Sequence, residues 1–139
     1  LDASVTAAWL LPDSASEHTR RLYTLIRRDE VEPQAPNLWQ WECSNLISSG
    51  VHSGRIPAAS VEGLWSVLEA IRHRVELHDL APAQHKAVMD VALDTGLPTF
   101  DAAYLWLARS LRLPLATFDP QQIAAAQRSG VPLLDLSSL

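Results

Sequence analysis

Short runs that are predicted to form β-strands alternate along this chain with segments whose apolar residues recur at helical spacing, and this alternation limits the folds that it can adopt. The runs cover residues 31–35, 75–80, 115–118 and 131–134, and a further one would end at Asp2, where little of it remains. Predicted helices separate the runs. Strands separated by helices pair in parallel, with helices on both faces of the sheet. The pattern therefore predicts a layered α/β sandwich.

Helix-starting and helix-ending residues divide the segments between these runs. The side chains of residues 13–16 are typical of a helix start, as is Asn37 followed by Gln40. Proline suits a first helical turn, and glycine often follows a last one. The predicted starts of this kind are Pro57, Pro82 and Asp119-Pro120, and the predicted stops are Gly50, Gly96 and Gly130. A further helix is expected over residues 100–111.

The composition fits one globular domain. The 139 residues are 47% hydrophobic and 19% charged, without a linker or repeat, so we expect a single domain over residues 1–139. No apolar run approaches the roughly 18 residues that a membrane-spanning helix needs, and no secretory leader is visible. The one cysteine, Cys43, cannot form an internal disulfide, which fits a reducing compartment. We therefore expect a cytoplasmic protein with no membrane partner.

The net charge of −5 argues at first against a nucleic-acid partner, because domains that bind nucleic acids usually carry a basic excess. An acidic site that held two divalent cations would offset most of this charge. The cationic residues are also grouped, since four arginines share one face of the helix after residue 16 at about 100° per residue. These are Arg20, Arg21, Arg27 and Arg28. Net charge therefore leaves the class of partner open.

Four acidic residues occupy positions that a parallel sandwich would bring to one edge: Asp2, Glu42, Asp101 and Asp119. Asp2 follows the remnant of the first run, Asp119 directly follows residues 115–118, and Asp101 lies in the first turn of a helix. Glu42 lies one turn inside its helix, and Asn45, three residues on, shares its face. Sites in parallel α/β sheets lie outside the carboxyl ends of the strands, so an acidic site is predicted there.

Gathered carboxylates repel one another, and burial protonates some of them unless cations compensate. Hard oxygen ligands suit magnesium or manganese, which can activate a water and neutralise charge on a phosphodiester. Each acid also has a purely structural interpretation. Asp119 could be an N-cap, Asp101 could complement a helix dipole, Glu42 could be solvated and Asp2 could lie at a frayed terminus. Spacing alone leaves both interpretations open.

Several motifs stand in order around the same acids. They are Leu1-Asp2-Ala3-Ser4-Val5, Trp9-Leu10-Leu11-Pro12, Pro36-Asn37-Leu38-Trp39, Glu42-Cys43-Ser44-Asn45, Gly54-Arg55-Ile56, Leu97-Pro98-Thr99-Phe100-Asp101-Ala102-Ala103-Tyr104-Leu105, Leu113-Pro114-Leu115-Ala116-Thr117-Phe118-Asp119 and Gly130-Val131. As an ordered set covering nearly the whole chain, they resemble the motifs of PIN-domain toxins of the VapC type. Two departures are the nearly missing first strand and Cys43, where family members usually have a small apolar residue.

The resemblance implies a PIN-like three-layer α/β/α sandwich with a central parallel sheet of about five strands. It also implies a metal-dependent endoribonuclease, the toxin of a toxin–antitoxin pair, which hydrolyses RNA phosphodiester bonds with a metal-activated water and Mg²⁺ or Mn²⁺. Asp2, Glu42, Asp101 and Asp119 would be its catalytic and metal-binding residues, supported by Ser4, Asn45 and Thr117. The implied partners are an RNA substrate (tRNA, rRNA or mRNA), a cognate antitoxin protein and a second copy in a homodimer.

Other residues allow more than one interpretation. The arginine face formed by Arg20, Arg21, Arg27 and Arg28 could follow an RNA backbone or could simply be solvated. Three tryptophans could line a groove for an antitoxin helix or belong to the core. We predict that Trp65 belongs to the core. For Trp39 and Trp41, both the groove and the core remain possible. The five histidines lack the spacing of a zinc site.

The main alternative to a nuclease is a catalytically inactive PIN-fold module that binds a protein through the tryptophan-bearing groove. All four acids are present, and this argues against a degenerate site. Two phosphotransfer domains that use an aspartate are also disfavoured. A receiver would need an acceptor aspartate after its third strand and a lysine after its last, and a haloacid-type phosphatase would need an aspartate where Ser4 stands.

Overall fold

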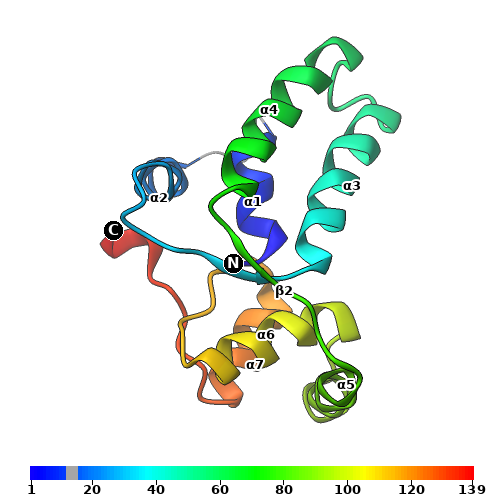
Figure 1. Ribbon diagram of the computed structural model, residues 1–139, viewed down its shortest axis with the longest axis vertical. Coiled ribbons are helices and arrows are strands. Elements are labelled where there is room, and N and C mark those ends of the chain that lie inside the picture. Colours follow the sequence, from blue (N-terminus) through cyan, green and yellow to red (C-terminus); the bar gives the residue numbers. More distant parts are fainter. Residues whose placement is uncertain (12–15) are drawn as a thin grey trace.

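The computed structural model describes residues 1–11 and 16–139 of the chain, and within them the secondary structure is mainly helical (Figure 1). The α-helices are α1 (Ala3–Leu10), α2 (Glu17–Arg27), α3 (Leu38–His52), α4 (Val61–Arg72), α5 (Pro82–Thr95), α6 (Thr99–Leu111) and α7 (Pro120–Arg128). Two short strands, β1 (Gln34–Pro36) and β2 (Glu76–His78), and two 3-10 helices, η1 (Ala58–Ser60) and η2 (Leu136–Ser138), complete the assignment.

The predicted sandwich around a five-stranded sheet is wrong. In the described part of the chain the sheet has two strands, β1 and β2, which pair in parallel from Gln34 opposite Glu76 to Pro36 opposite His78. The two later runs, predicted over residues 115–118 and 131–134, meet only at an isolated parallel bridge between Leu115 and Leu133. Seven α-helices therefore dominate the described residues, and the sheet is a minor element.

The first two residues connect β1 to the segment before α7. The nitrogen of Leu1 donates to the oxygen of Gln34 at 2.7 Å, and the nitrogen of Asp2 donates to the oxygen of Ala116 at 2.9 Å. Residues 1–2 thus lie between β1 and residues 115–117. They make one hydrogen bond to each side, and α1 begins directly after them at Ala3.

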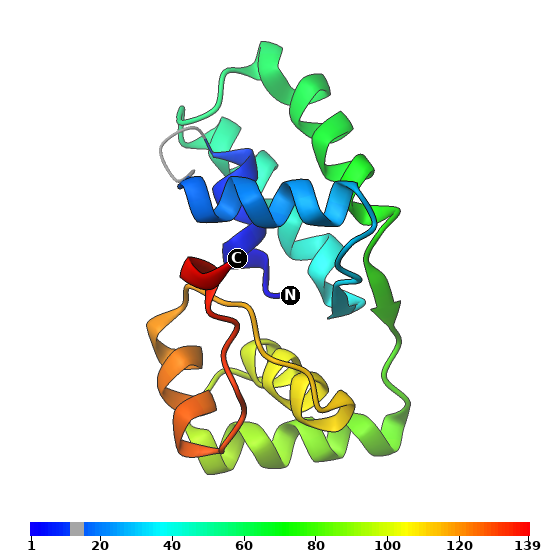
Figure 2. The same ribbon diagram turned by 90° about the vertical axis from the view of Figure 1, so that its left-hand side faces the viewer.

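The helices form two halves that meet near the N-terminus (Figures 1 and 2). One half contains α1, α2, α3 and α4, and the other contains α5, α6 and α7. The chain passes from one to the other through β2, and after α7 it runs back to η2, which lies against α2 (Figure 2). The main core spans both halves, from Trp39 and Cys43 of α3 to Leu105 of α6 and Ala125 of α7.

Several predicted helix boundaries agree with the structure. Ser16 is the N-cap of α2, and its Oγ accepts from the nitrogen of Thr19 at 3.2 Å. The remaining predicted starting residues, 13–15, and Pro12 of the second motif lie outside the described residues. Gly96 ends α5 with a left-handed φ of 76°, and Asp119 caps α7. In the part of the chain that can be described, no helix combines the length and apolar character required to cross a membrane.

Two local predictions are wrong, and one helix was not foreseen. Helix α3 continues through Gly50 to His52, and the absence of a side chain at Gly50 leaves room for Ile56. The Asn37 side chain makes no capping bond; its amide donates to the Asp79 carboxylate. Helix α1 occupies residues that follow the expected first strand, and Asp2 is its N-cap.

Candidate functional site

The four acids come from four helices that meet at the junction of the two halves. Asp2 and Asp119 are the N-caps of α1 and α7, Asp101 lies in the first turn of α6, and Glu42 lies in the second turn of α3. The charges of Asp119 and Asp2 act on Asp101, and those of Asp2 and Asp101 act on Glu42. The structure therefore brings the four predicted acids together, although the sheet expected to position them is largely absent.

Two hydroxyl groups hold the buried carboxylate of Asp2. Its Oδ2 accepts from Thr117 Oγ1 at 2.9 Å and from the Ser4 hydroxyl. The same hydroxyls accept backbone bonds from the loop before α7, Thr117 Oγ1 from the nitrogen of Asp119 at 3.0 Å and Ser4 Oγ from the nitrogen of Phe118 at 2.9 Å. Ser4 and Thr117 thus connect the start of α1 to the start of α7.

Gln122 connects two of the acids, and the sequence interpretation did not include it. Its backbone nitrogen donates to Asp119 Oδ1 and its side-chain Nε2 donates to Asp101 Oδ1, both at 3.4 Å. The residue is 1% exposed, and its Oε1 has no hydrogen-bond partner among the described residues. Gln122 lies three residues after Asp119, so helical spacing could have placed it on the same face.

Tyr104 is a second residue that the sequence interpretation missed. Its hydroxyl donates to Glu42 Oε2, and the side chain is buried. Burial and the nearby Glu42 carboxylate raise the pKa of Tyr104, so its hydroxyl remains a proton donor. Tyr104 follows Asp101 by three residues on α6, and this spacing was the available signal.

The environment of the cluster favours protonated carboxyl groups. Burial raises the pKa of Asp101 above its ordinary value, and the charges of Asp119 and Asp2 raise it further. Burial also raises the pKa of Glu42, with contributions from Asp2 and Asp101, while the Tyr104 hydrogen bond acts in the opposite direction. In residues 1–11 and 16–139, no ion pair joins a cationic side chain to these acids. The described cationic side chains therefore make no direct contact with this negative charge.

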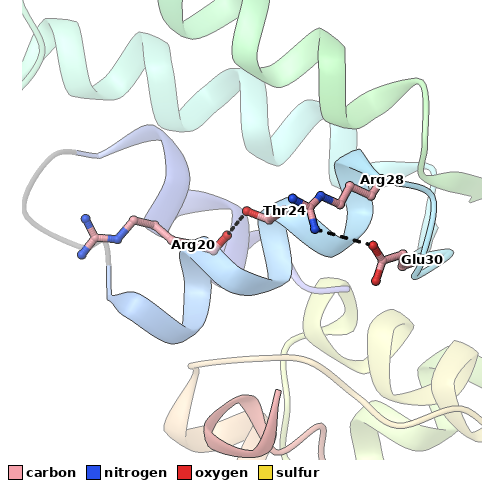
Figure 3. A network of polar contacts seen from close by, with 4 residues as sticks. All are labelled: Arg20, Thr24, Arg28 and Glu30. Carbon is pink, nitrogen blue, oxygen red and sulfur yellow. Dashed lines mark hydrogen bonds and ion pairs between the residues drawn. The ribbon is translucent and has the colours of Figure 1, made fainter.

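Other predicted site residues lie apart from this network. Asn45 is exposed, and no hydrogen bond joins its side chain to Glu42 among the described contacts. The arginine face is exposed along and just beyond α2. Figure 3 shows Arg20 near the beginning of this helix and Arg28 just past its end, where Arg28 pairs with Glu30 at 3.9 Å. The structure thus leaves these side chains outside the acidic network.

The donor chemistry of the cluster suits a hard divalent cation. Its carboxylate and hydroxyl oxygens match the ligands of Mg²⁺ and Mn²⁺. Within the described ranges, no three or more histidine, cysteine, aspartate or glutamate side chains are arranged to hold one ion together. Mg²⁺ commonly takes only one or two carboxylates and keeps waters or substrate phosphates as its other ligands. Asp101 and Asp119, joined through Gln122, are a suitable pair of this kind.

The tryptophans are divided between the core and the surface. Trp39 is fully buried, and its Nε1 donates to Thr6 Oγ1 at 3.1 Å. Trp41 is 74% exposed, and Trp65 is 44% exposed, so the prediction that Trp65 belongs to the core is wrong. All three line a hollow of about 320 Å³ between α3 and α4.

Comparisons with known proteins support the fold and leave the activity open. No family model matches the chain, and no curated protein matches it. Among solved structures, it is similar to the crystal structure of PAE2754 from Pyrobaculum aerophilum, with a TM-score of 0.71 and 24% sequence identity. The match covers 99% of this chain and 87% of that chain. At this identity the likeness shows that the two chains share a fold, and no more.

Proposed function

We propose that the chain is an endoribonuclease dependent on Mg²⁺ or Mn²⁺, with Asp2, Glu42, Asp101 and Asp119 in its active site. The observation that carries this proposal is a cluster of acids from four helices that, in the described part of the chain, forms no ion pair with a cationic side chain. Burial and mutual repulsion raise the pKa of Asp101 and of Glu42. Such an arrangement costs stability in the metal-free chain, and a bound cation would relieve it.

Each residue has a distinct task in this proposal. The carboxylates of Asp101 and Asp119 would hold the metal with Asp2 close to it, and Glu42 would orient the attacking water or accept a proton from it. Ser4 and Thr117 fix the orientation of the Asp2 carboxylate through hydrogen bonds. Gln122 orients the Asp101 carboxylate in the same way, and Tyr104 orients that of Glu42. When bound, the metal would activate the water and neutralise charge on the phosphodiester. Without it, the carboxylates would repel the phosphate.

RNA cleavage tests the proposal. A mixed tRNA and rRNA pool is incubated with the native chain in Mg²⁺ or Mn²⁺, with EDTA, and with Asp101→Asn. Asp94→Asn is the matched control, because it removes the same charge from an exposed position on α5. We expect native and Asp94→Asn chains to cleave, and no cleavage by Asp101→Asn or in EDTA. Cleavage that survives Asp101→Asn, or a folded native chain that cleaves nothing, would reject the proposal.

The role as the toxin of a toxin–antitoxin pair belongs to the same proposal. Its support is the ordered set of motifs that resemble VapC-type toxins. An antitoxin protein and a homodimer are the partners that this resemblance implies. Expression provides a separate test, because the native chain should arrest bacterial growth and Asp101→Asn should not.

A second candidate function, a protein-binding module, is favoured by the exposed indole rings of Trp41 and Trp65 beside a hollow. A metal titration distinguishes the two candidates. A nuclease should bind Mn²⁺ more weakly after Asp101→Asn and equally well after Asp94→Asn. A module with a vestigial site should show no difference between these variants.

A further inference from the structure

A hollow of about 580 Å³ lies between the start of α3, the end of β2 and the beginning of α6. Phe100 forms part of its wall and is 67% exposed. Its other apolar walls include Leu38 and Val88, and its polar edge includes Asn37, Asp79 and His85. The volume falls within the range of roughly 300–1,000 Å³ that is typical of small-molecule sites.

The hollow lies next to the acidic cluster along two helices. Phe100 directly precedes Asp101 on α6, and Leu38 precedes Glu42 by four residues on α3. Residues four apart on a helix have Cβ atoms about 5–6 Å from each other. The hollow therefore begins within about one helical turn of two site acids, and a nucleotide with its phosphate at the cluster could extend its base toward the hollow.

The walls of the hollow suit the flat face of a nucleobase. Unpaired bases stack on aromatic side chains in complexes of proteins with single-stranded RNA. Phe100 supplies such a ring, which is exposed at a position where a soluble chain would more often carry a polar residue.

The polar edge of the hollow suits a base that carries an amino group. Asn37 is fixed on two sides, since its Nδ2 donates to Asp79 Oδ1 and its Oδ1 accepts from Gln40 Nε2. Asp79 is exposed, and a carboxylate accepts the N–H groups of adenine, cytosine or guanine. Uracil has no exocyclic amino group, and its one ring N–H lies between two carbonyl oxygens, which a carboxylate repels.

We propose that this hollow binds an unpaired, amino-bearing base of the RNA substrate, with Phe100 as the stacking face and Asp79 as the acceptor. The assignment of the ligand to RNA rests on the proposed function. The substrate would accordingly be single-stranded near the scissile phosphate, because a base in a duplex is stacked and paired.

Neutral nucleosides test the hollow without involving the metal site. Adenosine, cytidine and uridine are titrated in EDTA, and the ring signals of His85 are followed by NMR, with His52 as an internal reference outside the hollow. We expect adenosine and cytidine to shift the His85 signals and uridine to bind at least severalfold more weakly. Phe100→Ala should weaken adenosine binding about fivefold or more, and Phe100→Tyr should retain it.

Phe118→Ala is the matched control. Phe118 is also an exposed phenylalanine that directly precedes a site acid, but it does not line the hollow. The Phe118→Ala variant should leave nucleoside binding unchanged, and circular dichroism checks that each variant is folded. No shift at His85, equal binding of uridine, or unchanged binding by folded Phe100→Ala would overturn the proposal.

The outcomes for this site and for the nuclease can be separated. If RNA is cleaved but no nucleoside binds, the base site alone is rejected. If adenosine and cytidine bind as expected but RNA is not cleaved, the base site is supported and the proposed nuclease activity is rejected.

Discussion

At the scale of single residues, the surroundings of two carboxyl groups favour their protonated forms. Burial is the largest cause of the raised pKa of Asp101 and of Glu42, and the neighbouring acids add to it. Gln122 and Tyr104 act against these shifts by donating hydrogen bonds to the two carboxylates. The site therefore combines repelling charges with a small number of neutral donors that hold them in position.

The raised pKa values predict how stability depends on pH. Above the ordinary pKa values of 3.8 for Asp101 and 4.5 for Glu42, the folded chain binds more protons than the unfolded chain until the raised values are passed. The free energy of unfolding of the metal-free chain therefore contains a contribution that falls as pH rises through this window. Asp101→Asn removes the part of this decrease in the free energy of unfolding that comes from Asp101.

Thermal unfolding in EDTA at neutral pH measures this effect. We expect a higher melting temperature for Asp101→Asn than for the native chain, and little change for Asp94→Asn. The advantage of Asp101→Asn should diminish as the solution is acidified. A melting temperature equal to or below that of the native chain at neutral pH would show that the charge of Asp101 does not destabilise the folded chain.

Gln122→Met should separate the positioning of Asp101 from the stability of the fold. Methionine is similar in size but cannot donate to Asp101. The substitution also removes an Oε1 that has no partner among the described groups. We expect RNA cleavage at limiting Mg²⁺ to fall about tenfold, while the free energy of unfolding changes by no more than about 1 kcal/mol. Cleavage rate and urea denaturation measure the two quantities.

The neighbouring Gln121→Met is the control, because Gln121 is exposed on the same helix. It should leave cleavage unchanged. If Gln122→Met cleaves as fast as the native chain at every Mg²⁺ concentration, Gln122 has no positioning role.

At the scale of the elements, helix ends were predictable where their signal is local. The Ser16 cap, the left-handed Gly96 and the Asp119-Pro120 start are each specified by a few adjacent residues. The predicted helix end at Gly50 was wrong, because this glycine makes room for Ile56, which packs against it from beyond the end of α3. A single sequence does not distinguish a glycine that ends a helix from one that permits close packing.

Substitution of two helical glycines tests this explanation. A Cβ at Gly50 would lie 2.8 Å from Ile56 Cγ1, whereas a Cβ at Gly63 in α4 would meet nothing within 4 Å. We expect Gly50→Ala to lower the free energy of unfolding by about 1 kcal/mol, since overpacking outweighs the gain in helix propensity. Gly63→Ala should raise it by about 0.5–1 kcal/mol. Urea denaturation measures both, and a stabilised Gly50→Ala would contradict the packing role.

At the scale of the whole molecule, the sequence predicted which segments are buried better than it predicted which segments pair as strands. Leu115, Ala116 and Thr117 are buried as their apolar run predicts. An apolar run indicates that a segment is buried, but it does not show that the segment pairs as a β-strand. The five-stranded sheet was therefore inferred from burial and resemblance, and the structure retains a two-stranded sheet with one isolated bridge.

The candidate site was more predictable than the sheet. Three of its four acids stand at helix beginnings, where the sequence signal is local, and the ordered motifs include all four, although the sheet expected to gather them is largely absent among the described residues. Gln122 and Tyr104 were missed because their partners, Asp101 and Glu42, lie on other helices. Contacts between elements of this kind depend on the tertiary arrangement, which one sequence does not specify.

The most direct test of a metal site formed by the whole fold is the position of Mn²⁺ in crystals of the chain, located by anomalous scattering. We predict Mn²⁺ bound to carboxylate oxygens of at least two of Asp2, Asp101 and Asp119. The ion should be lost or weakened in Asp101→Asn and retained in Asp94→Asn. Crystals soaked in millimolar Mn²⁺ that show no ion at these acids, or the same occupancy in Asp101→Asn, would contradict the account.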